Sequence, residues 1–319
     1  MTRVVAAGAG RMGRGLAVTF AMAGHPVALI DLKPRADGAY LDGAQAEIAA
    51  TLDMIAACGL IAPGDIPRIA RRIGYVAEDE ADEVMSEAEL IFEGAPETLE
   101  AKEATLARIS AASGDAIIAS TTSTILSDDL AGFVARPERF LNAHWLNPAY
   151  LVPIVEVSPA AATAPETTTK LVGMLEETGK TPVVCKASPG FIIPRIQALA
   201  MNEAARLVEE GVASAEDIDK ATKYGFGFRF AVLGMLEFID FGGGDILHHA
   251  SRYMTDATGD DRFEAPEIVK RNMAEGRLGL RTGSGFLDYE GMDVDAYRLE
   301  RMKAFTAMLR HMGRAPKVG

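Results

Sequence analysis

The stretch Val4-Val5-Ala6-Ala7-Gly8-Ala9-Gly10-Arg11-Met12-Gly13 joins a short apolar run to a glycine-rich turn near the start of the chain. A helical pattern over residues 15–23 follows and stops at Gly24. A second apolar run, 26–30, ends on Asp31. The order is therefore strand, glycine turn, helix, strand and terminal acid, which is the order of a βαβ unit that binds a dinucleotide.

The three glycines of the turn each have a physical role in such a unit. Gly8 allows the tight turn, Gly10 lets the backbone approach a pyrophosphate, and Gly13 lets the helix pack closely on the strand. The phosphates would lie at the N-terminus of the helix, where N–H groups and the helix dipole favour anions. We therefore predict that the cofactor contacts Gly8, Ala9, Gly10, Arg11, Met12 and Gly13.

Asp31 indicates which dinucleotide is bound. A carboxylate at the end of the second strand accepts hydrogen bonds from both ribose hydroxyls and repels a 2′-phosphate. This favours NAD over NADP as the cofactor. Lys33 and Arg35 are close to Asp31 in the sequence and keep NADP as the alternative.

The composition narrows the class of protein. A chain of 319 residues is long for one core and suggests two domains. Its apolar runs stay well short of the ~20 residues of a membrane span, and it starts directly into a strand without a signal peptide, so we expect a cytoplasmic protein. The net charge of −13 opposes binding to nucleic acid or to an anionic membrane. Cys58 and Cys185 have neither metal-ligand spacing nor a disulfide framework, so we expect no metal.

Strands and helices alternate up to Ser188, which predicts an α/β fold with a mostly parallel, doubly wound sheet of Rossmann type. After Pro189 the strand pattern ends and only helical patterns follow. We therefore predict an NAD-binding domain at 1–188 and an all-helical domain at 189–319. Because the helices of the second domain are apolar, we expect them to contact a second copy of the chain and form a homodimer.

The boundaries of the predicted elements follow from the apolar runs and their spacing. Strands are predicted at 4–7, 26–30, 74–76, 90–94, 116–120, 139–144, 154–157 and 182–184. Helices are predicted at 15–23, 43–58, 78–89, 97–109, 125–133, 167–178, 191–210, 215–222, 231–253, 266–275 and 294–312. A basic turn is predicted at 68–73, and a flexible loop at 224–230.

A series of motifs extends along almost the whole chain. It comprises Gly8–Gly13, Glu93-Gly94-Ala95-Pro96-Glu97 with Lys102, Ser120-Thr121-Thr122-Ser123, His144-Trp145-Leu146-Asn147-Pro148, Glu156, Pro189-Gly190-Phe191, Gly276-Arg277-Leu278-Gly279 and Thr282-Gly283-Ser284-Gly285-Phe286. Together these motifs resemble the 3-hydroxyacyl-CoA dehydrogenase family, which also contains free-acid enzymes such as L-gulonate 3-dehydrogenase (lambda-crystallin) and carnitine dehydrogenase. The resemblance implies an NAD-dependent oxidoreductase.

The resemblance implies catalytic roles for four side chains. Oxidising an alcohol needs a base for the hydroxyl proton while the hydride leaves carbon, and His144 suits this near neutral pH. Glu156 lies in an apolar strand, where a carboxylate is costly unless it is paired, and the imidazolium of His144 is its natural partner. Ser123 and Asn147 are the expected donors to the substrate's oxygen or carboxyl group. The resemblance also implies that the cofactor contacts Glu97, Lys102 and Thr121.

Each catalytic candidate also has an ordinary structural interpretation. His144 could be a satisfied polar residue at a strand end, and Glu156 could face solvent on an edge strand. Ser123 could cap the helix predicted from Ile125, and Asn147 could belong only to a turn. The alternative from another class is therefore a non-catalytic protein that binds NAD(H) as a sensor or structural component.

The chain departs from the family pattern at two positions. Thr121 and Pro194 stand where many members have asparagine. Thr121 keeps a hydroxyl but lacks the side-chain amide with which asparagine would contact the nicotinamide. Pro194 lacks the side-chain amide that asparagine would place near the substrate. Because proline has no N–H, we expect Pro194 in the first turn of its helix.

Two features bear on the substrate. CoA carries phosphate groups, which proteins usually bind with Lys or Arg. Acyl-CoA members of the family present basic residues on the helix after the second strand. The corresponding residues of this chain, 36–67, contain neither Lys nor Arg. Arg229 lies in a glycine-rich segment that resembles the free-acid branch. It could pair with a substrate carboxylate, or it could be a surface arginine packed on Phe228. We therefore expect a small L-3-hydroxy acid, with a 3-hydroxyacyl-CoA such as 3-hydroxybutyryl-CoA as the alternative.

Overall fold

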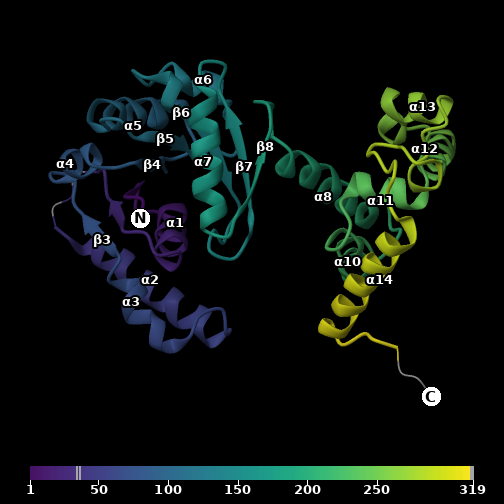
Figure 1. Cartoon of the computed structure of the whole chain (residues 1–319), viewed down its shortest axis with the longest axis horizontal. Helices are drawn as coiled ribbons and strands as arrows, with labels where there is room; N and C mark the ends of the chain where they lie inside the picture. The colour runs from purple at the N-terminus through teal and green to yellow at the C-terminus, as the bar shows by residue number, and fades with distance from the viewer. Residues whose placement is uncertain (34, 36, 317–319) are drawn as a thin grey trace. The chain divides into compact units, whose positions relative to one another are not determined.

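The structure is a computed structural model that describes residues 1–33, 35 and 37–316 (Figure 1). Its internal contacts divide the chain into two compact units, Met1–Ala200 and Met201–Gly319. The division falls inside helix α8 (Ile193–Glu209), whereas the predicted domain boundary follows Ser188. The two units are described separately below.

One eight-stranded sheet forms the centre of the first unit. Its strands are β1 (Val4–Ala7), β2 (Val27–Ile30), β3 (Ile73–Val76), β4 (Leu90–Glu93), β5 (Ile117–Ser120), β6 (Phe140–Trp145), β7 (Ile154–Pro159) and β8 (Thr181–Val184). They lie in the order β3-β2-β1-β4-β5-β6-β7-β8, and all neighbours are parallel except the antiparallel pair β6 and β7. The predicted mostly parallel sheet is confirmed.

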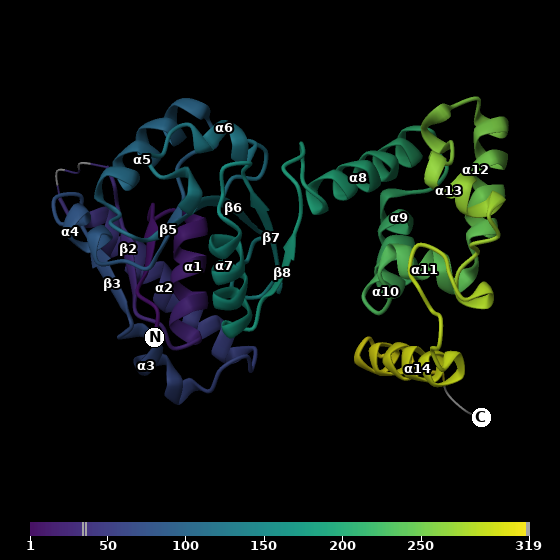
Figure 2. The same ribbon diagram turned by 45° about the horizontal axis from the view of Figure 1, so that its top comes forward.

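Helices cover both faces of this sheet (Figure 2). They are α1 (Arg11–Met22), α2 (Ala39–Ala57), α3 (Ile66–Ala70), α4 (Ala81–Ser86), α5 (Leu99–Ala112), α6 (Ser127–Ala131) and α7 (Pro165–Glu177), with the 3-10 turns η1 (Pro63–Asp65) and η2 (Pro137–Arg139). Leu16, Ile48 and Leu171 bring α1, α2 and α7 to one buried cluster. Leu106 and Leu130 bring α5 and α6 to a second cluster. The fold is therefore doubly wound.

The residues of β1 alternate between these two clusters. Val4 and Ala6 belong to the first cluster, and Val5 and Ala7 belong to the second. Successive side chains of a strand point to opposite faces of the sheet. A strand that is covered on both faces therefore consists of a continuous apolar run, which is the pattern seen in the sequence.

The turn after β1 is shaped by close backbone contacts at two glycines. Gly8 has a φ of +126°, and a Cβ atom there would lie 2.9 Å from the carbonyl oxygen of Gly94. A Cβ on Gly13 would lie 1.9 Å from the carbonyl oxygen of Gly8. A Cβ on Gly10 would meet no atom within 4 Å. The backbone at Gly10 is therefore open on the side from which a ligand can approach.

The described part of the second unit is helical. Its elements are the C-terminal half of α8, α9 (Ala215–Ala221), the π-helix η3 (Thr222–Gly227), α10 (Phe228–Phe230), α11 (Met235–Gly242), α12 (Gly244–Thr258), η4 (Asp261–Phe263), α13 (Glu267–Ala274), η5 (Leu280–Thr282) and α14 (Val294–His311). Extended pairing there is limited to isolated bridges at Ser284 with Gly279 and Asp288. The predicted combination of a Rossmann-type sheet and a helical C-terminal part is confirmed.

Asp240 organises the glycine-rich segment near the end of this unit. Its buried carboxylate accepts hydrogen bonds from the N–H groups of Phe286 and Leu287 at 3.0 and 2.8 Å. A Cβ on Gly285 would lie 2.1 Å from this carboxylate, and one on Gly279 would lie 2.2 Å from the Asp240 carbonyl oxygen. The glycines of this motif therefore serve the packing of the loop around Asp240.

Three predicted elements of local structure were wrong. The predicted flexible loop at 224–230 is helical, because η3 runs directly into α10. The predicted single helix at 231–253 is divided between α11 and α12 at Gly243, which has a φ of +112°. Part of the predicted basic turn at 68–73 belongs to α3, whose first turn contains Pro67.

Candidate active site

His144 and Glu156 face each other across the antiparallel strands β6 and β7. The two residues are direct cross-strand partners, and His144 Nδ1 lies 2.7 Å from Glu156 Oε2. Their exposed fractions are 6% and 1%. The interpretation of Glu156 as a solvent-facing residue on an edge strand is therefore wrong.

The second oxygen of Glu156 is held by backbone. Oε1 accepts hydrogen bonds from the N–H groups of Ile192 and Ile193 at 2.8 and 2.7 Å. Ile193 is the first residue of α8 and Ile192 precedes it, so these N–H groups lie at the N-terminus of the helix, where its dipole favours a negative charge. Burial acts to raise the pKa of Glu156, but the hydrogen bonds from His144, Ile193 and Ile192 outweigh it and lower this pKa below its ordinary value. The carboxylate is therefore ionised at neutral pH.

An ionised carboxylate fixes the tautomer of His144. Because a carboxylate only accepts hydrogen bonds, the neutral imidazole must carry its proton on Nδ1 and donate it to Glu156. Nε2 then has a lone pair that can accept a proton. The ring of Phe191 stacks on the imidazole with 5.8 Å between ring centroids and 25° between ring planes. Phe191 is buried and has a φ of +42°, so the turn before α8 directs this ring against His144.

Glu97 holds the loop that follows β5. Its Oε1 accepts hydrogen bonds from Thr122 Oγ1 at 2.5 Å, Ser123 N at 2.7 Å and Thr124 N at 3.0 Å. Burial acts to raise the pKa of Glu97, but the Thr122 hydroxyl, the charge of Lys102 and the backbone N–H groups lower it to about 2. Glu97 is therefore an anionic anchor for the segment that contains Ser123.

A buried ion pair lies beneath Glu97. Lys102 Nζ lies 3.1 Å from Glu93 Oε2 and 3.4 Å from Glu97 Oε2. Glu93 Oε2 also accepts a hydrogen bond from Ser120 Oγ at 2.6 Å. Glu93, Lys102 and Ser120 are all fully buried. Lys102 therefore holds Glu97 from below. Its expected contact with the cofactor stays a prediction.

Ser123 and Thr121 lie on this same loop. Ser123 is half-buried, and its Oγ lies 3.2 Å from Glu97 Oε1. Thr122, rather than Ser123, accepts a hydrogen bond from the N–H group of Ile125, so the interpretation of Ser123 as a helix cap is wrong. Thr121 is half-buried, and its N–H group donates to the carbonyl oxygen of Glu93 at 3.0 Å.

Asn147 is exposed on the loop between β6 and β7. It lines a cavity of about 340 Å³ together with Arg11, Arg14 and Tyr150. Arg14 donates to the carbonyl oxygen of Ala9 at 2.9 Å and pairs with a carboxylate of α2. Asn147 and Arg11, the first residue of α1, therefore line one cavity that extends between α1, α2 and the loop after β6.

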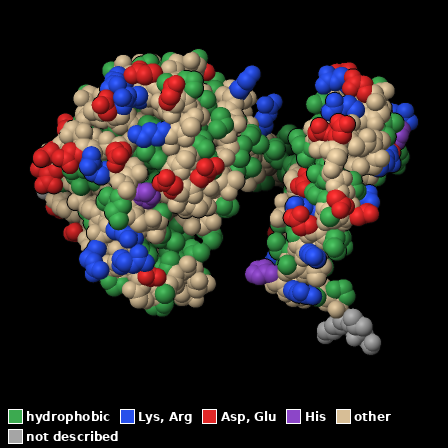
Figure 3. All heavy atoms as spheres, viewed as in Figure 1, with side chains coloured by type: hydrophobic (Ala, Val, Ile, Leu, Met, Phe, Trp, Pro, Cys, Tyr) green, Lys and Arg blue, Asp and Glu red, His purple; other side chains and the backbone are tan. Residues whose placement is uncertain are grey.

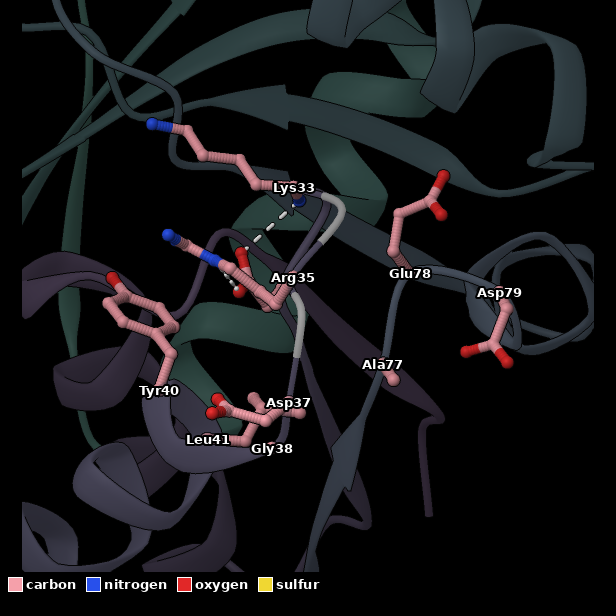
Figure 4. A pocket seen from close by; sticks show the side chains of 10 residues that line it. Lys33, Arg35, Asp37, Gly38, Tyr40, Leu41, Ala77, Glu78 and Asp79 are labelled. Carbon is pink, nitrogen blue, oxygen red and sulfur yellow. Dashed lines mark hydrogen bonds and ion pairs between the residues drawn. The ribbon is translucent and has the colours of Figure 1, made fainter.

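Asp31 lines a second cavity, of about 350 Å³, at the ends of β2 and β3 (Figure 4). Its carboxylate is 4% exposed, pairs with Arg35 Nε at 2.7 Å and accepts the N–H group of Lys33 at 3.2 Å. Figure 4 shows Glu78 and Asp79 across the pocket from Arg35. Four carboxylates and two cations line this cavity: Asp31, Asp37, Glu78, Asp79, Lys33 and Arg35.

Arg229 lies in the second unit, exposed on α10. Its guanidinium lies 5.4 Å from the centroid of the Phe238 ring. The predicted alternative, packing on Phe228, is therefore replaced by a contact with Phe238.

Two family models match consecutive parts of the chain. Residues 3–188 match the NAD binding domain of 3-hydroxyacyl-CoA dehydrogenase, and residues 190–289 match its C-terminal domain. The chain belongs to the 3-hydroxyacyl-CoA dehydrogenase family. It is accordingly an NAD-dependent oxidoreductase, and its first unit carries the family's cofactor domain.

Relatives extend this similarity over nearly the full length. The chain is 30% identical to 5-formyl-3-hydroxy-2-methylpyridine 4-carboxylate 5-dehydrogenase of Mesorhizobium japonicum, over 95% of this chain and 96% of the relative. It is 31% identical to a probable 3-hydroxybutyryl-CoA dehydrogenase of Bacillus subtilis, over 90% of this chain and 97% of the relative. A solved 3-hydroxyacyl-CoA dehydrogenase of Archaeoglobus fulgidus is 30% identical with a TM-score of 0.78, covering 98% of this chain and 100% of that one.

The family's cofactor fits the residues of the glycine turn. No side chain caps the N-terminus of α1, whose N-cap residue is Gly10. The open space at Gly10 and these N-terminal N–H groups together form a surface that suits a pyrophosphate.

Among the described residues, no group of His, Cys, Asp or Glu side chains could hold a metal ion. Within the same residues, no helix combines the length and apolar character needed to cross a bilayer.

Sequence reasoning missed several groups that shape the site. Phe191 belongs to a sequence motif, but nothing in the sequence indicates that its ring stacks on His144. The two N–H groups that bind Glu156 are backbone and leave no residue-type signal. The motifs that contain Glu93 and Ser120 do not indicate the buried contacts of Glu93 with Ser120 and with Lys102. The one signal in the sequence is a carboxylate at the end of an apolar strand, which is costly unless it has a buried partner. Pro194 occupies the first turn of α8, as expected.

Proposed function

We propose that this family member oxidises the hydroxyl of a small L-3-hydroxy acid to the 3-keto acid, with His144 as the general base. The observation that carries the proposal is the buried His144–Glu156 pair, in which Nδ1 faces the carboxylate and Nε2 remains to accept a proton. When bound, NAD accepts the hydride from the substrate carbon. Glu156 stabilises the imidazolium that forms after proton transfer.

Ser123 and Asn147 are proposed to donate hydrogen bonds to the substrate. Glu97 supports Ser123 through the contacts described above. Thr121 and Glu97 are proposed to lie beside the nicotinamide end of the cofactor, and Asp31 is proposed to bind the adenosine ribose. The excess of carboxylates around Asp31 supports NAD over NADP, because a 2′-phosphate would be repelled. Figure 3 shows acidic side chains gathered over the adjoining α4 region, where Asp79, Glu80, Asp82 and Glu83 are exposed.

Three observations support a small acid over a CoA thioester. The described residues of 36–67 contain no Lys or Arg for the CoA phosphates. The cavity beside Asn147 has a volume of about 340 Å³ and is lined by Arg11 and by Arg14, which pairs with Glu47, so Arg11 is the cation proposed to face a compact anion. The Mesorhizobium relative is named for a pyridine carboxylate. Arg229 remains a proposed second contact for the substrate carboxylate.

A CoA thioester is the second candidate substrate, because the Bacillus and Archaeoglobus relatives are named for acyl-CoA reactions. A panel of 3-hydroxy acids and their CoA thioesters, given to the purified enzyme with NAD, tests the proposal through NADH absorbance. Turnover of a free acid is expected. Absence of turnover with every free acid would reject the substrate class.

We also propose that the protein is a cytoplasmic homodimer. Its free cysteines, Cys58 and Cys185, suit a reducing compartment. Large apolar side chains are exposed on α8 and in the second unit, including Leu199 at 70%, Met201 at 63% and Tyr253 at 73%. Apolar surface of this kind is usually covered by a partner.

Sedimentation velocity at micromolar concentration tests the assembly. The wild-type chain of 33.9 kDa is expected to sediment as a dimer. Leu199→Glu is expected to shift the protein towards monomer, because a carboxylate would be desolvated at the contact. Leu60→Glu, at an exposed leucine of the first unit, is the matched control and should remain dimeric. A monomeric wild-type protein would rule out the dimer.

The pKa of Glu97 predicts a pH-dependent contribution to stability. Its value in the folded protein is about 2, below the ordinary value of 4.5, so ionised Glu97 stabilises the fold above pH 4.5. This contribution is lost as the pH falls from 4.5 towards 2. Glu97→Gln should therefore lower the urea midpoint at about pH 6, and the difference from wild type should shrink at about pH 3.5. Glu100→Gln, at an exposed position of α5, is the control. A difference that stays constant with pH would contradict the assignment.

A further inference from the structure

Lys180 is a buried lysine that the proposed mechanism does not use. Its residue is 8% exposed, and burial lowers the pKa of its amine. Nζ donates hydrogen bonds to the carbonyl oxygens of Ala149 at 2.5 Å and Val152 at 2.9 Å. It also lies 5.8 Å from the centroid of the Trp145 ring. Among the described residues, no carboxylate forms an ion pair with it.

The end of α7 fixes the direction of this side chain. Gly179 has a φ of +78°, and its N–H group donates to the carbonyl oxygen of Glu176 at 2.9 Å. The N–H group of Lys180 donates to the carbonyl oxygen of Leu175 at 3.1 Å. This pair of hydrogen bonds is a Schellman motif, which terminates the helix and sets the backbone of the two residues that follow its C-cap. The lysine side chain therefore leaves a rigid helix end.

The side chain reaches the loop that carries Asn147. This loop, 146–153, connects the strand of His144 to the strand of Glu156. On its other side, Ala149 packs against α1, where a Cβ on Gly15 would lie 3.2 Å from the Ala149 Cβ. The loop is thus held between α1 and the ammonium of Lys180.

We propose that Lys180 is a positioning residue for the substrate: its ammonium fixes the 146–153 loop and thereby the place of Asn147. The inference rests on the proposed function, in which Asn147 contacts the substrate. A cation that donates to two carbonyl groups of one turn makes stronger hydrogen bonds than a neutral donor would. Misplacing a substrate contact by about 1 Å can reduce the rate by roughly 10²-fold.

Lys180→Met tests the proposal, because methionine keeps an unbranched apolar stem and removes the donors. The substrate is whichever hydroxy acid or thioester the wild-type enzyme turns over. We expect kcat/KM for that substrate to fall by roughly 10- to 100-fold, while the Kd for NADH stays within about twofold of wild type. Far-UV circular dichroism and the thermal unfolding midpoint report on the fold independently of activity, whereas emission from Trp145 would respond directly to the loss of the neighbouring ammonium. Lys170→Met, at an exposed lysine of α7, is the matched control and should resemble wild type.

Unchanged kcat/KM in folded Lys180→Met would overturn the proposal, as would an equal loss of NADH affinity, because either result indicates a purely structural lysine. If Lys180→Met does not fold, Lys180→Arg decides, because it keeps a cation at this position but cannot place it as the ammonium does against the carbonyl oxygens of Ala149 and Val152. It should lower kcat/KM with NADH affinity retained, and wild-type kinetics in Lys180→Arg would reject the positioning role. Failure of the proposed function would give a different result, because the wild-type enzyme itself would turn over no free 3-hydroxy acid.

Discussion

His144→Gln is expected to lower kcat by roughly 10²- to 10⁴-fold and to leave the Kd for NADH unchanged. Glutamine preserves the approximate size of the side chain and a hydrogen-bonding group towards Glu156, but it cannot accept the hydroxyl proton. The cofactor residues of the glycine turn lie between β1 and α1 and in the first turn of α1, whereas His144 lies on β6. The measurements are steady-state kinetics and NADH titration.

The matched control for this substitution is His25→Gln. His25 is also buried, but it precedes β2 at the opposite edge of the sheet, where its Nδ1 accepts the N–H group of Thr2 at 3.0 Å. Normal turnover is expected for this variant. Near-normal turnover in His144→Gln with unchanged NADH binding would place the proton acceptor elsewhere and reject the assigned site.

Glu156→Gln is expected to cause the second-largest loss, of roughly 10²-fold or more. The N–H groups of Ile192 and Ile193 already donate to Oε1, so the amide oxygen of glutamine should occupy that place. The amide NH₂ group then faces His144 Nδ1 and donates to it. This forces the ring proton onto Nε2 and removes the lone pair that accepts the substrate proton. The charge that stabilises the imidazolium is lost as well.

Kinetics, thermal unfolding and NADH titration together separate these effects for Glu156→Gln. A folded variant with normal NADH affinity and strongly reduced kcat is expected. Turnover close to that of wild type would show that the tautomer of His144 is not set by Glu156.

The alternation of apolar runs predicted most of the first unit correctly, because strands that are buried on both faces leave a strong local signal. Glycine patterns were less reliable guides. The glycines at 8 and 13 are required by backbone contacts within the turn, as their positions in the sequence suggested. Those of the 224–230 segment indicated a loop, but the segment is helical and packs its aromatic rings, such as Phe226 on Phe230 at 4.5 Å. Tertiary packing overrides a local propensity there.

In the candidate site, too, some features could be predicted from the sequence and others could not. The distance between His144 and Glu156 follows from two adjacent strands, so their pairing could be predicted from spacing and from the cost of an unpaired buried carboxylate. The burial of Lys102 could not be predicted, because a resemblance assigns a residue to a site without giving its depth. The role of Lys180 depends on two backbone carbonyls from a distant loop, which no sequence pattern marks.

The most direct test of the proposed function compares acetoacetate with acetoacetyl-CoA as the oxidant of NADH by the wild-type enzyme. We predict a higher kcat/KM for the free acid, because α2 presents no cation to the CoA phosphates and Arg11 lies beside Asn147 as a partner for a carboxylate. A higher kcat/KM for acetoacetyl-CoA, with little or no turnover of acetoacetate, would contradict this proposal and make the enzyme a 3-hydroxyacyl-CoA dehydrogenase in its substrate as well as in its family.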